Sequence, residues 1–311
     1  MTVSSGPLER GYVRHSRVVD AMLVGTVVLW ALNITATKYL ISNGWSPLAY
    51  GTLRYFFAIV LFAAYTYHRE RSFAIARRDI KLVLLAGGLI FCNQLCFVYG
   101  LKFTQASTVG LLLGTTPMFI GTISAALGLE RLGRSFWIGA IVTVLGVAFV
   151  ALGSGRVDSS AVGVLLAIAL ALTWSAYSVV IAPLMRRYSP FRISTVVLAT
   201  GWLPLAVVGA HQIAAQQFTF GWLAWLAFAF AVIGPLFLTN VLWFTAMSRV
   251  GPSRAALFAN FEPFLAVVFA VILLSERLYA IEIVGGVLIL AGIVLERVWH
   301  QPTAGAMSAL D

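Results

Sequence analysis

The sequence has few charged side chains, few cysteines and few histidines. Charged residues make up 10% of its 311 residues, against 60% hydrophobic residues, and there are only two cysteines and four histidines. Two cysteines offer no disulfide framework, and four scattered histidines predict no metal-ligand cluster. This composition, with a mean hydropathy of +0.94, excludes an ordinary soluble domain and indicates an integral membrane protein.

The groups that membrane-embedded enzymes need are missing as well. Hydrolases in the bilayer use an activated pair, such as two aspartates or a serine with a base, or a bound metal. No Asp or His lies well inside an apolar run, since Asp20 stands at the first turn of the first run. We therefore expect no catalysis, no metal and no cofactor.

The apolar residues fall into ten runs, each near the length of about 20 residues that a helix needs to cross the hydrocarbon. The first run is too long for a signal-peptide core and is expected to be retained. Residues 1–17 and 300–311 are then tails. The ten predicted helices are Val18–Ile41, Pro47–Tyr67, Ile80–Leu101, Ala106–Leu129, Phe136–Leu152, Ala161–Met185, Ile193–Ile213, Trp222–Met247, Ser253–Leu274 and Ile281–Trp299.

The distribution of Lys and Arg predicts the orientation, because these residues accumulate in cytoplasmic loops. With a cytoplasmic N-terminus, sixteen of the 21 lysines and arginines lie in inner segments, and the remaining five are Lys38, Arg54, Lys102, Arg156 and Arg277. Both tails are therefore predicted to be cytoplasmic, in a bacterial-type inner membrane. The net charge of +10 is explained by this topology and the anionic inner leaflet, so no nucleic-acid partner is expected.

One unit of the sequence occurs twice. Pro117 is followed thirteen residues later by Glu130-Arg131-Leu132, and Pro263 by Glu276-Arg277-Leu278 at the same spacing. The shift of 146 residues also superposes several further pairs without a gap: Ser107 on Ser253, Leu111 on Leu257, Gly139 on Gly285 and Gly146 on Gly292. A duplicated unit of this kind indicates internal repeats.

Five helices per half make the two repeats inverted, since an odd number brings the second half in from the opposite side. The predicted repeats are residues 18–153 and 161–299. Inverted halves place a central cavity near the midplane that either side can seal, which is the geometry of alternating access. A channel would need a ring of chains or a polar filter, and neither is visible.

At this point the chain resembles the EamA-type branch of the drug/metabolite transporter superfamily in four segments: VVLWALNITATKYL, SPLAYGTLRYFFA, GLKFTQASTVGLLLGTTPMFIGTISAALGLERLG and AMSRVGPSRAALFANFEPFLAVVFAVILLSERLY. The resemblance implies ten helices in inverted repeats, with helices 1–4 and 6–9 around a cavity and helices 5 and 10 outside. It also implies transport, often outward, of amino acids, drugs, sugars or other metabolites. The aromatic spans favour the aromatic amino acid exporter type.

Glu262 is the sharpest candidate for a transport residue. It stands inside a predicted span before Pro263, and an ionised carboxylate near the bilayer centre costs about 3 kcal/mol. It should therefore be neutral, paired or facing a watery cavity. It could bind a substrate ammonium, carry a proton, or be a structural carboxylate that is hydrogen-bonded to its neighbours or paired with Arg54.

Other polar and aromatic residues in the spans are expected to face the cavity, because buried amides must find partners in lipid. The alternative for each is a role in helix packing. The predicted substrate-binding residues besides Glu262 are Trp30, Asn33, Thr37, Asn93, Gln94, Tyr99, Trp174, Tyr177, Asn240 and Trp243. Lys38 and Arg54 are possible charge partners, and Pro204, Gly234 and Pro235 are possible hinges.

The sequence thus predicts an all-α secondary transporter that exports small metabolites, most of all neutral or aromatic amino acids, by alternating access. The alternative is a multidrug or quaternary-amine exporter of the same fold, since aromatic walls also bind organic cations. The expected partners are a small-molecule substrate and the lipid bilayer. The sequence leaves the energy source and the oligomeric state open.

Overall fold

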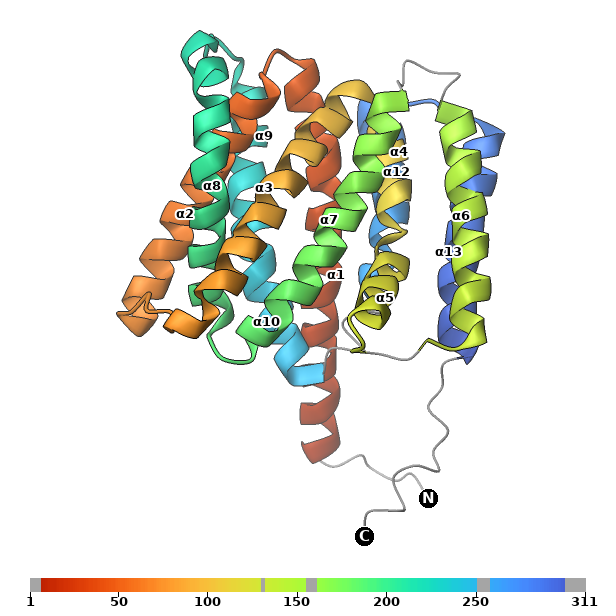
Figure 1. The fold of residues 1–311 in the computed structure, drawn as a ribbon, viewed down its shortest axis with the longest axis horizontal. Coiled ribbons are helices and arrows are strands. Elements are labelled where there is room, and N and C mark those ends of the chain that lie inside the picture. Colours follow the sequence, from red (N-terminus) through yellow and green to blue (C-terminus); the bar gives the residue numbers. More distant parts are fainter. Residues whose placement is uncertain (1–6, 130–131, 155–160, 251–257, 300–311) are drawn as a thin grey trace.

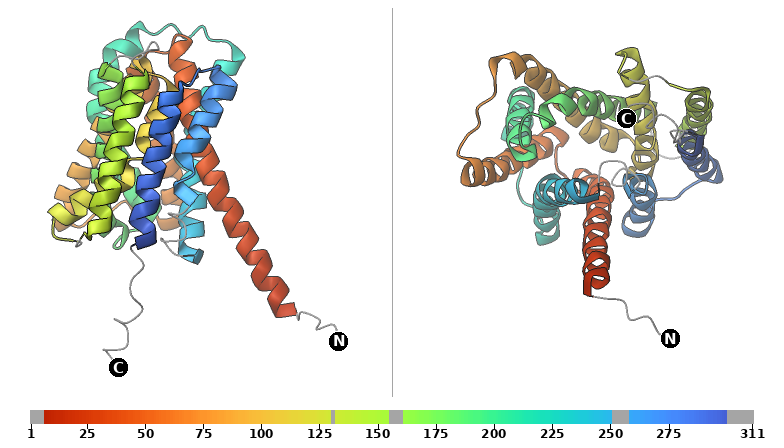
Figure 2. Two further views of the ribbon diagram at one scale, coloured as in Figure 1. Left: turned by 90° about the vertical axis from the view of Figure 1, so that its right-hand side faces the viewer. Right: turned by 90° about the horizontal axis from the view of Figure 1, so that it is seen from below.

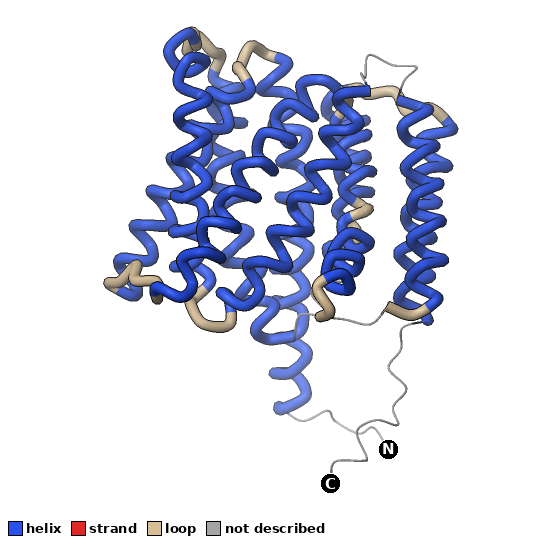
Figure 3. The backbone as a smooth tube through the Cα atoms, in the orientation of Figure 1, coloured by secondary structure: helices blue, strands red, loops and turns tan. Residues whose placement is uncertain are grey.

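The computed structural model describes residues 7–129, 132–154, 161–250 and 258–299. Within these ranges every regular element is a helix and none is a strand (Figure 3). The elements are α1 (Pro7–Ser42), α2 (Pro47–Glu70), η1 (Arg77–Asp79), α3 (Ile80–Phe103), α4 (Ala106–Leu113), α5 (Thr116–Ala126), α6 (Arg134–Ser154), α7 (Ala161–Met185), α8 (Pro190–Ala215), α9 (Trp222–Val232), η2 (Ile233–Leu238), α10 (Thr239–Val250), α12 (Glu262–Leu274) and α13 (Ala280–Trp299).

Eight of the described helical segments are long and apolar enough to cross a membrane. Two further apolar helices, Glu262–Leu274 and Ala280–Leu295, are shorter. Helix α1 begins at Pro7 rather than at Val18, where the apolar run begins, so it extends into the polar segment and projects beyond the other helices (Figure 2). Proline at the start of a helix costs it no hydrogen bond, which suits this early beginning.

Two predicted helices are interrupted at equivalent places. The run predicted as Ala106–Leu129 divides into α4 and α5 around Gly114 and Thr115, and in the other half a turn at Asn260 and Phe261 precedes α12. Helices α5 and α12 begin at Thr116 and Glu262, which are 146 residues apart, and each has proline as its second residue. Because proline lacks an N–H and clashes with the preceding turn, the helix restarts at this point.

A third interruption lies in the run Trp222–Met247. Gly234 and Pro235 are buried in the π-helical segment η2, between α9 and α10. Proline removes one backbone hydrogen bond, and a π turn absorbs the resulting change of helical phase. The hinge proposed from the sequence at these two residues thus coincides with a real irregularity. Pro204 lies inside the continuous helix α8.

Helices α6 and α13 pack on each other at one edge of the molecule (Figure 1). An added Cβ on Gly146 would stand 2.6 Å from the carbonyl oxygen of Gly285, and one on Gly292 would stand 2.5 Å from that of Gly139. The absence of a side chain at these glycines therefore allows the two helices to pack closely. Gly139 corresponds to Gly285 and Gly146 to Gly292, so the two contacts are related by exchange of the halves.

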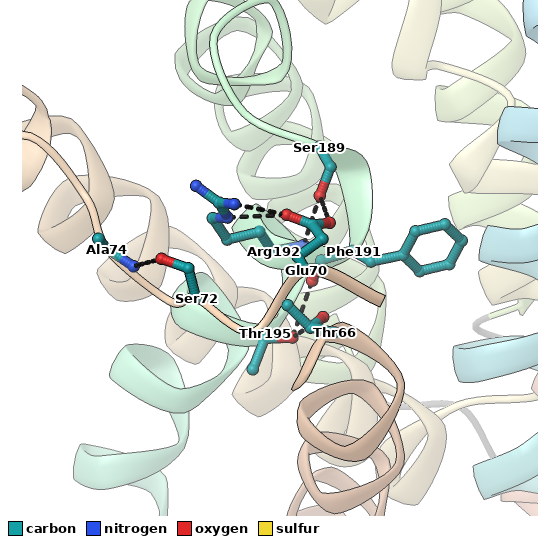
Figure 4. A network of polar contacts seen from close by, with 8 residues as sticks. All are labelled: Thr66, Glu70, Ser72, Ala74, Ser189, Phe191, Arg192 and Thr195. Atoms are coloured by element: carbon teal, nitrogen blue, oxygen red, sulfur yellow. Dashed lines mark hydrogen bonds and ion pairs between the residues drawn. The ribbon is translucent and has the colours of Figure 1, made fainter. Parts of the chain in front are cut away.

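Helices α2 and α8 also pack together, and each holds the beginning of the other. Glu70, at the end of α2, accepts hydrogen bonds from Ser189 Oγ and from Arg192 Nε (2.9 Å), and it forms an ion pair with Arg192 (Figure 4). At the opposite end of the pair, Gln212 of α8 accepts a hydrogen bond from the backbone N–H of Leu48 (2.8 Å). Gln216, which directly follows α8, accepts one from the backbone N–H of Ser46 (2.7 Å). Side chains therefore join the end of each helix to the beginning of the other, and at the beginning of α2 they satisfy backbone N–H groups.

Candidate functional site

A cavity of about 590 Å³ lies among the helices and has the size of a small-molecule site. Its wall is mostly apolar, with a small number of polar side chains. Its lining residues are Trp30, Asn33, Ile34, Arg54, Tyr55, Asn93, Gln94, Phe97, Leu113, Gly114, Thr116, Pro117, Ile120, Gly121, Leu170, Trp174, Ser178, Pro235, Leu236, Trp243, Ala259, Asn260, Glu262, Pro263 and Ile293.

Both equivalent helix interruptions open onto this cavity. Gly114, Thr116 and Pro117 line it from one half, and Asn260 and Glu262 from the other. The beginnings of α5 and α12 therefore face the same space. Helix N-termini inside a membrane carry partial positive charge and unpaired N–H groups, which makes them suited to contact polar ligands.

Arg54 is a buried cation in the cavity wall, with an exposed fraction of 3%. Its Nη1 donates to Asn33 Oδ1 at 3.0 Å and to the Tyr50 hydroxyl at 3.2 Å, and its Nη2 donates to Gln94 Oε1 at 3.3 Å. These acceptors are all neutral. The predicted alternative of a pair between Arg54 and Glu262 does not hold, because the ion pairs among the described residues involve only Asp79 and Glu70 as acids.

Glu262 is the first residue of α12 and the acidic residue of the cavity wall. In the part of the chain that the structure describes, its carboxylate takes part in no ion pair. A carboxylate in the first turn of a helix is stabilised by the helix dipole. The wall thus carries the Glu262 carboxyl group and the Arg54 guanidinium, and the two form no direct ion pair.

Aromatic rings supply much of the remaining wall. The rings of Trp30 on α1 and Trp243 on α10 lie 5.1 Å apart, between helices from the two halves. Trp174 on α7 is 40% exposed and lies 5.4 Å from the ring of Tyr177. Tilted contacts of this kind stabilise aromatic pairs and leave ring faces and edges for a ligand.

The structure brings together seven of the eleven predicted substrate-binding residues in the cavity wall: Trp30, Asn33, Asn93, Gln94, Trp174, Trp243 and Glu262. The other four do not line the cavity, and each contacts another side chain or a backbone carbonyl. Thr37 shares a 2.8 Å hydrogen bond with the Tyr50 hydroxyl, Tyr99 accepts from Gln212 at 3.0 Å, Tyr177 packs beside Trp174, and Asn240 donates to Leu236 O at 2.6 Å.

Of the two possible charge partners, Arg54 lines the cavity and Lys38 does not. The Lys38 ammonium donates to the carbonyl oxygens of Leu101 and Thr104, both at 2.8 Å, at the end of α3. A cation there stabilises the unpaired carbonyls of a helix C-terminus. Of the possible hinges, Pro235 lines the cavity.

Several lining residues were not predicted from the sequence. Phe97 and Tyr55 pack around Arg54, with ring centroids 5.3 and 5.5 Å from its guanidinium carbon. Thr116 and Asn260 belong to the helix interruptions. The repeated prolines were the available signal for these interruptions, because a proline that recurs at an equivalent position marks a helix break in each half.

Comparison with known proteins identifies the family. The model of the EamA-like transporter family matches residues 18–152 and again residues 161–296. A solved crystal structure superposes with a TM-score of 0.64 at 21% identity, over 92% of this chain and 99% of that one, which shows the shared fold.

Curated relatives are similar over most of their length. The transporter YetK of Bacillus subtilis is 25% identical over 88% of this chain and 82% of its own. A protein of Salmonella typhimurium named "probable amino-acid metabolite efflux pump" is 26% identical over 88% of this chain and 92% of its own. A "probable terminal-alkyne amino-acid exporter" of Streptantibioticus cattleyicolor is 26% identical over 91% and 94%.

These matches cover both halves of the chain and agree with a helical membrane fold around a small-molecule cavity. The chain belongs to the EamA-like transporter family, within the drug/metabolite transporter superfamily, and is a multi-pass membrane transporter.

Proposed function

We propose that the protein is an inner-membrane carrier that exports amino acids, neutral or aromatic ones foremost, by alternating access between two inverted five-helix repeats. In this proposal both tails are cytoplasmic, as the Lys and Arg distribution predicts. The beginning of α1 and the end of α13 lie on the same side of the molecule, which agrees with such a topology (Figure 1).

The pattern of helix packing supports inverted repeats over residues 18–153 and 161–299. The counterpart of α3 in the second half is the run of α9, η2 and α10, and the counterpart of α7 in the first half is α1. Helix α3 packs on α7, and α1 correspondingly packs on α9, η2 and α10. The counterpart of α12 in the first half is α4 with α5. Helix α1 packs on α12, and α7 correspondingly packs on α4 and α5. This exchange is expected of two repeats related by a two-fold axis, and in inverted repeats that axis lies in the membrane plane.

One observation carries the substrate class: Arg54 and Glu262 line the same cavity without an ion pair between them. A wall that holds a guanidinium and a carboxyl group apart from each other is complementary to a zwitterion, because the carboxylate and the ammonium of a zwitterion need partners of opposite charge. The three tryptophans give an amino-acid side chain apolar surface. One relative is named an amino-acid exporter and another an amino-acid metabolite efflux pump, and both names agree with this substrate class.

A multidrug or quaternary-amine exporter is the second candidate. The observation that favours it is the close pair Trp30 and Trp243, because tryptophan faces attract organic cations. The fixed positive charge of Arg54 in the same wall opposes a cationic substrate. The amino-acid proposal therefore has the stronger support.

Counterflow in proteoliposomes distinguishes the two. Proteoliposomes that contain the purified protein are loaded with an unlabelled amino acid or with an unlabelled lipophilic cation, and the uptake of the same compound in labelled form is measured for each. We expect saturable exchange of amino acids, weakened in Trp174→Ala. Folded protein that exchanges the cation and no amino acid would overturn the proposal in favour of the second candidate.

The same vesicles test Glu262. If its carboxylate binds the substrate ammonium, Glu262→Gln weakens exchange both with and without a pH gradient. If instead it carries a proton, the variant loses only the uptake that a pH gradient drives and keeps exchange. Unchanged exchange and unchanged gradient-driven uptake would leave Glu262 a structural carboxylate.

A further inference from the structure

The Arg54 guanidinium is packed among aromatic rings in the cavity wall. The rings of Tyr50, Tyr55 and Phe97 surround it, with centroids 5.3–5.5 Å from the guanidinium carbon. Contacts between a guanidinium and aromatic rings fix its plane and contribute cation–π attraction. A fixed plane means that the edge left without acceptors has a defined direction.

That edge still lacks hydrogen-bond acceptors. A guanidinium has five N–H donors; Nη1 uses two of them on Asn33 and Tyr50, and Nη2 uses one on Gln94. Nε is buried without a partner, and so is the Nε2 amide of Gln94, a residue only 1% exposed. Unpaired buried donors are costly and uncommon, so this pair points to a missing acceptor.

The charge of the guanidinium is also uncompensated by a nearby carboxylate in the described part of the chain. Taking a cation out of water without a counter-ion is expensive. An anion at the free edge would remove this penalty. A carboxylate fits best, because its two oxygens match the parallel N–H groups of a guanidinium.

We propose that Arg54 and Gln94 form the subsite for the carboxylate of the transported substrate. The inference rests on the proposed function and assigns one end of the amino acid to one end of the cavity. The Arg54–Gln94 hydrogen bond is the longest of the three, at 3.3 Å. When the substrate enters, its carboxylate replaces Gln94 Oε1 at the Nη2 and Nε edge, and the Gln94 amide turns so that Nε2 donates to the same carboxylate.

Competition in the wild-type protein tests the subsite without any mutation. Counterflow of labelled L-phenylalanine is measured against unlabelled L-phenylalanine, L-phenylalaninamide and N-acetyl-L-phenylalanine. The amide lacks the carboxylate and keeps the ammonium, whereas the acetyl compound does the reverse. We expect the amide to compete about 10- to 100-fold less well than phenylalanine, as the loss of a charge-assisted contact predicts.

The variant Gln94→Glu gives a matched second test, since it preserves the shape of the side chain and places an internal carboxylate beside Arg54. This carboxylate occupies the guanidinium edge, so phenylalanine loses affinity and its advantage over the amide falls to near one. Asn93→Asp is the control, because Asn93 lines the same cavity but donates to Leu170 O and Thr173 Oγ1 on α7. It places a similar charge nearby without taking the guanidinium edge.

The outcomes separate the inference from the proposed function. Equal competition by phenylalanine and its amide in the wild type, together with an unchanged ratio in Gln94→Glu, would overturn the carboxylate subsite while the exporter proposal stands. Absence of any amino-acid exchange by folded protein would overturn the proposed function and the subsite with it. A preference for the carboxylate that disappears in Gln94→Glu and persists in Asn93→Asp supports the subsite.

Discussion

The Glu276 carboxylate holds the beginning of α4 through Ser107, a residue 169 positions earlier in the chain. Its Oε2 accepts from the Ser107 backbone N–H at 2.9 Å and hydroxyl at 2.6 Å, and its Oε1 accepts from the Ala106 N–H at 2.8 Å. Glu276 belongs to the repeated Glu-Arg-Leu sequence, so one copy of this motif caps a helix of the other half. The equivalent pair in the other half, Glu130 for Glu276 and Ser253 for Ser107, lies outside the described residues.

Removing this cap is expected to destabilise the protein. In Glu276→Ala the backbone N–H groups of Ala106 and Ser107, two fully buried residues, lose their acceptor. The free energy of unfolding should therefore fall by about 1–2 kcal/mol. Thermal unfolding of the purified protein measures the effect. The neighbouring Arg277 is exposed, so Arg277→Ala is the control and should unfold near the wild-type temperature. Equal melting of both variants would contradict the capping role.

Lys38 is expected to act on stability and not on substrate binding. Lys38→Met removes two charge-assisted hydrogen bonds to the end of α3 and should cost about 1–3 kcal/mol. Because Lys38 does not line the cavity, the concentration of amino acid that half-saturates counterflow should stay unchanged. Lys102→Met, at an exposed position of the last turn of α3, is the control for stability. A strong rise in the half-saturating concentration would show that Lys38 contacts the substrate.

Two glycine-to-alanine changes should act in opposite directions. In Gly146→Ala the new Cβ would lie 2.6 Å from the backbone of Gly285, so α6 and α13 must separate, at a cost of about 1–3 kcal/mol. In Gly88→Ala no atom lies within 4 Å of the new Cβ, and the higher helix propensity of alanine should stabilise α3 by up to about 1 kcal/mol. Melting curves in one detergent compare them. A stabilised Gly146→Ala would exclude close contact at this position.

Gly51 provides an indirect test of the Gln94 position. A Cβ on Gly51 would stand 2.9 Å from Gln94 Nε2, the far end of a flexible side chain, so Gly51→Ala should displace the amide with little loss of stability. We expect the preference for phenylalanine over its amide to change while the melting temperature moves by only a few degrees. The Gly88→Ala protein serves as the control for altered helix propensity. An unchanged preference would mean that Gln94 does not contact the ligand.

Helix positions and family could be predicted from the sequence because they depend on local patterns. Apolar run length predicted membrane helices, and the repeated Pro and Glu-Arg-Leu spacing led to the family that the comparison confirms. Helix breaks were less visible. Pro117 and Pro263 served to align the repeats, yet the restart of the helices at Thr116 and Glu262 became clear only in the structure.

The candidate site could be predicted only in part, since helical periodicity gives the direction of a side chain and not its depth. Trp30, Asn33 and Thr37 share one face of α1, but Thr37 lies a turn further along and meets Tyr50 instead of the cavity. Asn240 was a reasonable candidate, but its amide donates to the carbonyl of Leu236 inside the π-helical segment η2. The ring of neutral partners around Arg54 comes from three helices, and no local pattern reveals it.

The glycine contacts between α6 and α13 have the form of a homodimer interface. Gly146 contacts Gly285, which is the counterpart of Gly139, and Gly139 contacts Gly292, which is the counterpart of Gly146. This is the self-complementary arrangement of an isologous contact. A five-helix half therefore carries a surface that matches its own antiparallel copy. Residues 18–153, expressed without the second half, should be able to recruit an identical chain in place of the missing partner.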